Sequence, residues 1–315
     1  MTQTAQVERA RAQLFPAAPS PAGPLFAVLD AARDGEIERL TTSFQLRFLY
    51  LLDGITDAEL ARSAPRVVEL GPRPSTGFDR LLTQGYGRSW GYYLRSRAPL
   101  LDIRDQLASL LVAELPDGSV VRFRLFDPRV LRVYLPTCTP EELARVFGPI
   151  ECFLLEHPAP PASGEVLECF ARDAEGELCH SVEHIEERAP KPPPRQPEPL
   201  QLRGAQVDAL AARSRDDFHT RALAHLRRFF PQQCQQLGEA GTREMLELGV
   251  ARARRHGFVT ELEVCKYLNL MFSFGRDFDT EQVWARRLLG GGQGDQMERL
   301  YSLAQVNEAR ALGRV

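Results

Sequence analysis

The sequence predicts an α/β lobe, with a mixed sheet and flanking helices, followed by an all-α lobe. Two observations carry this prediction. Short apolar runs alternate with capped helical segments in the first part, and an apolar spacing of three and four residues begins at Leu202. A proline-rich stretch at 189–199 separates the two patterns. Because proline lacks a backbone donor, neither a helix nor a central strand is expected to continue through it.

We therefore expect four segments along the chain. Residues 1–23 form an N-terminal arm that is flexible or partly helical, and residues 24–187 form the α/β domain. Residues 188–200 form a stiff proline-rich linker, although a ligand for a proline-binding groove is also possible. Residues 201–315 form the helical domain. A length of 315 residues is comfortable for two domains.

Within the first lobe, short apolar runs bounded by turn residues are typical of buried strands. Thr56 and Glu59 have the spacing of a capping box, which predicts a helix through Arg62. Further helices are expected at 78–82 and 100–110. The expected strands are 25–29, 44–52 (where a helix is also possible), 66–70, 90–94 and 150–156, with hairpins at 111–115/120–126 and 166–170/177–182.

The sharpest local signal is a strand that turns abruptly into a helix at 123–131. Asp127 is well placed as the N-cap, and Pro128 fits the first helical position, where no donor is missed. Arg124 and Arg129 flank the turn. They either pair with local carboxylates or present a bidentate contact to a partner, and the sequence leaves both roles open. Thr139 begins a similar capped and proline-started helix.

The second lobe is expected to contain about five helices. Thr260 and Glu263 form another capping box. The helix that follows is expected to bury one face, and Asp279 with Gln282 is expected to start a further helix. The residues expected on the buried face are Leu262, Cys265, Leu268 and Phe272.

Charge and hydropathy exclude several classes of protein. The net charge of −3 produces no strong field toward nucleic acid or anionic membranes. No run reaches the roughly 18 apolar residues of a membrane helix, and no apolar signal-peptide core follows residues 1–12. We therefore expect a cytoplasmic protein whose six cysteines are reduced.

No catalytic motif stands out. The sequence has neither a Gly-x-Ser-x-Gly elbow nor a Walker A loop. The best metal candidate is a group of four residues: Cys169, Cys179, His180 and His184. Because adjacent strand residues point to opposite faces, Cys179 and His180 are not expected to converge. We therefore expect no catalytic residue, metal or cofactor. We interpret the basic cluster at 252–255 as a solvated or partner-facing surface rather than a nucleic-acid site.

Six segments, taken in order, resemble the DUF4123 family of type VI secretion adaptor chaperones over about residues 24–157. They are 28–32, 64–70, 90–91, 94–96, 123–129 and 147–149. The most specific element has the pattern Arg-x-aromatic-Asp-Pro-Arg, and a Phe-Gly-Pro element lies downstream. The residues that fill them are Arg124, Phe126, Asp127, Pro128, Arg129, Phe147, Gly148 and Pro149.

The resemblance implies a non-catalytic adaptor that binds a secreted effector and helps load it onto a VgrG spike protein, without nucleic acid or membrane as a partner. One departure is visible, because residues 105–107 read Asp-Gln-Leu where the family often has His-Leu-Arg. The helical tail, with segments 257–258, 267–268 and 275–279, also looks like tails of some members. The alternatives are a small metal-dependent or hydrolytic enzyme, a C-terminal half that is itself an effector, and an arginine-driven nucleic-acid binder.

Overall fold

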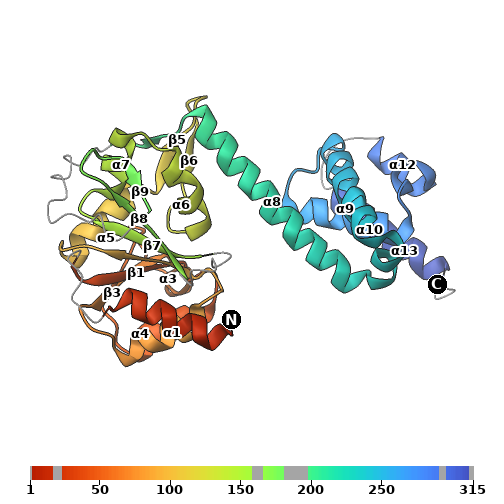
Figure 1. The fold of residues 1–315 in the computed structure, drawn as a ribbon. Helices are drawn as coiled ribbons and strands as arrows, with labels where there is room; N and C mark the ends of the chain where they lie inside the picture. The colour runs from red at the N-terminus through yellow and green to blue at the C-terminus, as the bar shows by residue number, and fades with distance from the viewer. Residues whose placement is uncertain (1, 17–22, 158–165, 181–197, 291–295, 312–315) are drawn as a thin grey trace. The chain divides into compact units, whose positions relative to one another are not determined.

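The computed structural model describes residues 2–16, 23–157, 166–180, 198–290 and 296–311, with side chains up to 306 (Figure 1). By its internal contacts the chain divides into two units, Met1–Leu210 and Ala211–Val315. The division falls within helix α8 (Gly204–Phe229). Most of the proline-rich linker expected at 188–200, together with His184, lies outside the described residues. The expected order of an α/β region followed by a helical region is confirmed.

The first unit is built on a seven-stranded sheet in the order β2-β3-β1-β4-β7-β8-β9. All its pairings are antiparallel, so the main sheet is not mixed. The sheet has the expected strands, with ends shifted by a few residues in places. They are β1 (Leu25–Leu29), β2 (Phe48–Tyr50), β3 (Arg66–Gly71), β4 (Gly91–Arg95), β7 (Cys152–Glu156), β8 (Leu167–Arg172) and β9 (Leu178–Cys179).

Strand β1 lies inside the sheet, between β3 and β4, and is buried along its whole length. Successive side chains of a strand point to opposite faces, so Phe26 and Val28 enter one core while Ala27 and Leu29 enter the other. Beside it, a Cβ atom at Gly91 would lie 1.8 Å from the carbonyl oxygen of Val28. Only glycine allows this approach of β4 to β1.

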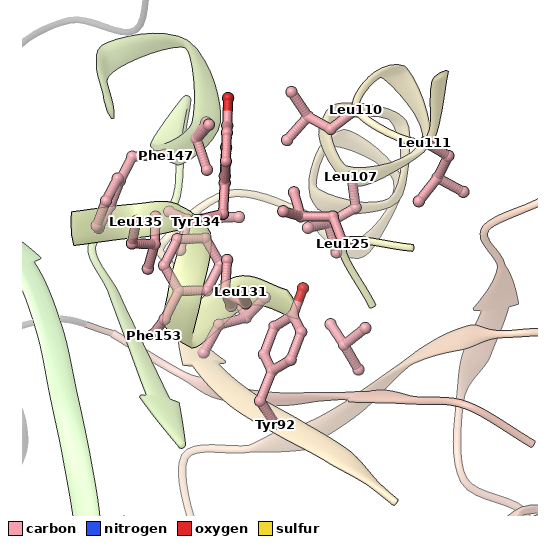
Figure 2. Close-up of a cluster of buried hydrophobic side chains, with 14 of the residues drawn as sticks. Tyr92, Leu107, Leu110, Leu111, Leu125, Leu131, Tyr134, Leu135, Phe147 and Phe153 are labelled. Atoms are coloured by element: carbon pink, nitrogen blue, oxygen red, sulfur yellow. The ribbon is translucent and has the colours of Figure 1, made fainter. Parts of the chain in front are cut away.

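Helices cover both faces of this sheet (Figure 1). The first core, shown in Figure 2, lies under α5 (Leu100–Ser109), α6 (Pro128–Tyr134) and α7 (Pro140–Phe147). The second core lies under three other helices, α1 (Gln3–Leu14), α2 (Gly35–Ser43) and α4 (Thr76–Gly85). Helix α3 (Ala58–Ser63) has no buried residue. The arm expected to be flexible or partly helical thus contains α1.

A second, three-stranded sheet completes the first unit. The predicted hairpin is present as β5 (Val112–Glu114) and β6 (Val120–Arg122). Strand β10 (Leu200–Gln201) pairs with β5 in parallel, opposite Ala113 and Glu114. Leu200 and Leu202 are buried in the first core. The chain on the far side of the proline-rich stretch therefore first completes the α/β unit and only then enters α8.

The described part of the second unit is helical and has its own core. Within the ranges that the structure describes, no helix is both long and apolar enough to cross a lipid bilayer. Beyond α8 the helices are α9 (Pro231–Arg255), which is interrupted by a positive φ of 69° at Gly238, α10 (Glu261–Phe274), α11 (Phe278–Glu281), α12 (Val283–Leu289) and α13 (Gln296–Ala311).

Three local predictions need correction. Helix α3 is capped by Asp57 rather than Thr56, because the Asp57 carboxylate accepts from the amides of Glu59 and Leu60. Leu262 is 66% exposed, since the buried face of α10 runs instead through Val264, Tyr267, Leu268 and Met271. Asp279 does not cap a helix but is buried and bonded to side chains of the second unit's core.

Candidate functional site

The predicted strand-to-helix turn is present between β6 and α6. The Asp127 carboxylate accepts a hydrogen bond from the Arg129 amide at 2.9 Å, and Pro128 occupies the first turn of α6, which confirms the predicted cap. The Arg129 side chain folds back onto the same carboxylate, donating from Nε at 3.0 Å and from Nη2 at 2.6 Å. Of the two roles left open for Arg129, pairing with a local carboxylate is therefore the one present in the structure.

Asp127 is buried, and its charge is stabilised by these neighbours. Burial raises the pKa of a carboxyl group because it disfavours the charged form. At Asp127 the hydrogen bonds from Arg129 and the nearby Arg124 charge outweigh burial, so the pKa lies below its usual value. The carboxylate consequently remains ionised at neutral pH and serves as a fixed anchor for the turn.

Arg124 links the turn to the end of strand β1. Its guanidinium donates to the Asp30 carboxylate at 2.8 Å, and Asp30 is buried directly after β1. The Arg124 side chain is nevertheless 54% exposed, and its guanidinium carbon lies 5.4 Å from the ring centroid of Phe126. Arg124 and the partly buried Phe126 thus form a cation–aromatic pair at the surface, and we call these two residues the Arg124–Phe126 pair.

The Phe-Gly-Pro element lies at the end of α7. Phe147 is buried in the first core, with its ring 4.9 Å from that of Phe153 (Figure 2). Gly148 caps the helix with a φ of 50°, and a Cβ atom there would lie 2.5 Å from the side chain of Gln106. The Pro149 carbonyl accepts a hydrogen bond from the Ser96 hydroxyl at 2.7 Å. This element is therefore occupied by internal contacts.

Gln106 belongs to the segment that departs from the family pattern. Its amide nitrogen donates to the carbonyls of Arg145 at 2.6 Å and Val146 at 3.2 Å, which satisfies the last turn of α7. The neighbouring Asp105 pairs with Arg104 at 3.0 Å. Sequence reasoning missed the roles of Asp30, Ser96 and Gln106, because their partners are distant in sequence and no local spacing signals them.

The candidate metal residues do not converge in the described part of the chain. Cys169 and Cys179 belong to the second core, whereas the His180 ring lies 4.8 Å from that of Phe170, which belongs to the first. Neighbouring strand residues thus point to opposite faces, as expected. His184 lies outside the described residues, and within the described ranges no three His, Cys, Asp or Glu side chains gather as metal ligands would.

The tail segments singled out by resemblance meet in the core of the second unit. The Tyr267 hydroxyl donates to the Asp279 carboxylate at 2.7 Å, and the Tyr267 ring lies 5.0 Å from that of Phe278. Arg252 donates to the same carboxylate at 3.2 Å and to Asp277 at 2.6 Å. Of the basic cluster at 252–255, Arg252 is therefore structural. Arg254 and Arg255 are exposed.

The first unit is an α/β domain. It has an antiparallel sheet with helices on both faces, and its helix α6 starts at a buried Asp-Pro cap. Residues 25–145 match the model of the DUF4123 family, described as a domain of unknown function. The predicted resemblance to the DUF4123 family is therefore confirmed over residues 25–145. No curated protein and no solved structure matches the chain.

Proposed function

We propose that this protein is a non-catalytic cytoplasmic adaptor that binds a type VI secretion effector and helps load it onto a VgrG-type spike protein. The resemblance of the motif at 123–129 to adaptor chaperones is the starting point, and the DUF4123 match at 25–145 supports it. In this proposal the α/β unit contacts the spike and the helical unit holds the effector.

The observation that carries the proposal is that most residues of the motif make internal contacts, whereas Arg124 is exposed. Asp127 and Arg129 bond to each other, and Phe147 and Gly148 are packed inside the unit. Arg124 is the exposed residue of the motif, and its guanidinium lies over the ring of the partly buried Phe126. Arginine and aromatic residues are enriched among the residues that dominate protein–protein binding energy. A motif that stabilises its own turn and presents such a pair suits recognition of another protein.

The proposal is tested by co-purification of the full chain with a candidate toxin and a VgrG protein from the same genome. We expect both to be retained. Arg124→Glu should weaken capture of VgrG about tenfold or more, because it reverses the charge of an interface arginine. Arg122→Glu provides a matched control, since Arg122 is an exposed arginine on the neighbouring strand. Failure of the full chain to retain either protein would contradict the adaptor role.

A further inference from the structure

The second unit contains a pocket that plays no part in the contacts of the motif at 123–129. Its volume is about 150 Å³, and it lies among α8, α9 and the start of α10. Arg215, Phe218 and His219 line it from α8, at the i, i+3 and i+4 spacing that puts them on one helical face. Val250 and Arg254 line it from α9, one helical turn apart.

The floor of the pocket is apolar. Phe218, Val250 and Val264 all line it and belong to the core of the second unit. At its edge Val259 is 74% exposed, and Leu262 is exposed on the adjoining first turn of α10. Two aliphatic side chains exposed so close to an apolar hollow extend the hydrophobic surface beyond the pocket. The pocket therefore suits a ligand that is longer than a single side chain.

The charges around the pocket are unbalanced. Arg215 and Arg254 are exposed, and neither guanidinium forms an ion pair or hydrogen bond with the residues that the structure describes. Glu261 is the acidic residue of the lining, and Arg221 binds its two oxygens at 2.6 and 2.7 Å. The Glu261 charge is thus already neutralised, and two guanidinium groups are left to attract an anion.

We propose that this pocket binds a short acidic and apolar peptide segment of a partner protein. An aliphatic side chain of the segment packs on Phe218, Val250 and Val264, and a neighbouring carboxylate pairs with Arg215 or Arg254. The inference rests on the proposed function only for the source of the segment, which is then the effector. Nucleic acid fits less well, because base stacking needs an accessible aromatic face and Phe218 is buried.

The test measures fluorescence polarisation of a labelled peptide, Ser-Glu-Glu-Leu-Leu-Glu-Ser, with the full chain. We expect saturable binding that falls about tenfold or more in Arg254→Glu and in Arg215→Glu, as for the loss of a charge-assisted contact. Arg255→Glu is the matched control, because Arg255 is exposed next to Arg254 but does not line the pocket. It should change binding less than about twofold. Replacing both leucines of the peptide by serine should weaken binding about as much as Arg254→Glu.

Three results would each overturn the inference: no binding of the peptide to the full chain, equal losses in Arg254→Glu and Arg255→Glu, or displacement by a single-stranded oligonucleotide of matched charge. The outcome is separable from that of the adaptor test. If the peptide binds at the pocket but no effector co-purifies, the pocket assignment stands and the adaptor role fails. If the effector co-purifies equally well with Arg254→Glu, the adaptor role stands and the pocket assignment fails.

Discussion

The guanidinium of Arg124 reaches the buried carboxylate of Asp30 at 2.8 Å, although 94 positions separate the two residues in the sequence. Asp30 directly follows the buried strand β1, and Arg124 precedes the cap of α6. The pair therefore fixes the signature turn to the middle of the sheet. One half of it is buried and the other half is at the surface, so substitutions on the two sides should have different consequences.

Arg124→Ala should lower the free energy of unfolding by about 1–3 kcal/mol, because it removes the guanidinium that donates to the buried Asp30 carboxylate. Asp127→Ala should cost about 1–3 kcal/mol, since it removes the cap of α6 and the carboxylate to which the Arg129 side chain donates. Urea denaturation of each variant and of the parent protein measures these changes in the free energy of unfolding. Asp57→Ala is the control for capping alone, because Asp57 caps the exposed α3. A cost at Asp127 no larger than at Asp57 would contradict the buried anchor.

Gly148→Ala should destabilise the first unit by about 2 kcal/mol or more, because it combines a left-handed backbone with a clash. Gly87→Ala separates the two effects, since Gly87 has a φ of 80° and no atom within 4 Å of the position that a Cβ atom would occupy. Thermal unfolding should therefore show a smaller loss at Gly87. Equal losses at the two glycines would mean that the contact with Gln106 contributes nothing.

Glu156 should make stability depend on pH. Burial raises its pKa from 4.5 to about 7, against the opposing effects of the Gly87 amide and of Arg132. Between these values the folded protein holds a proton that the unfolded chain has released, so stability falls as the pH rises from about 5 to 8. Glu156→Gln mimics the protonated form, and should match the parent protein at pH 5 but exceed it by about 1–3 kcal/mol at pH 8.

Urea denaturation at several pH values checks this prediction. The ion pair of His157 and Glu168, whose N–O distance is 3.5 Å, lies nearby, but it is common to both proteins and cancels in the difference. Parallel stability curves for the parent and Glu156→Gln would show that Glu156 titrates normally.

Asp279→Ala should destabilise the second unit by about 3 kcal/mol, because it leaves Tyr267 and Arg252 without their buried acceptor. Tyr267→Phe removes one hydrogen bond and should cost about 1 kcal/mol. Asp277→Ala, at a more exposed carboxylate on the same arginine, should cost less than about 1 kcal/mol. Fluorescence of Trp284 in a Trp90→Phe background follows unfolding of this unit. If Asp279→Ala were not the most destabilising of the three variants, Asp279 would not be the main polar anchor of this core.

Local chemistry made the elements of this fold predictable. The apolar run at β1, the Asp127 cap, the capped and proline-started helix at Thr139 and the capping box at Thr260 depend on residues within a few positions of one another, and all are present. The predicted cap of α3 is wrong because Thr56 and Asp57 are both good N-caps, and the neighbouring amides bond to the carboxylate.

Contacts between residues that are far apart in the sequence could not be predicted from local patterns. The buried face of α10 is decided by which helices pack against it, so periodicity alone did not exclude Leu262. The pocket joins Arg215 on α8 to Arg254 on α9, and their separation in the sequence carries no signal. The same holds for Arg124 and Asp30, whose pairing depends on the topology of the sheet.

Strand β10 also bears on how relatives of this protein could exchange their helical parts. Because Leu200 and Gln201 pair with β5, a crossover at the proline-rich stretch would take an edge strand away from the recipient's α/β unit. A crossover within α8, near the division at Leu210, would leave both hydrophobic cores intact. Recombination that preserves folding should therefore favour a junction inside α8 over one in the proline-rich stretch.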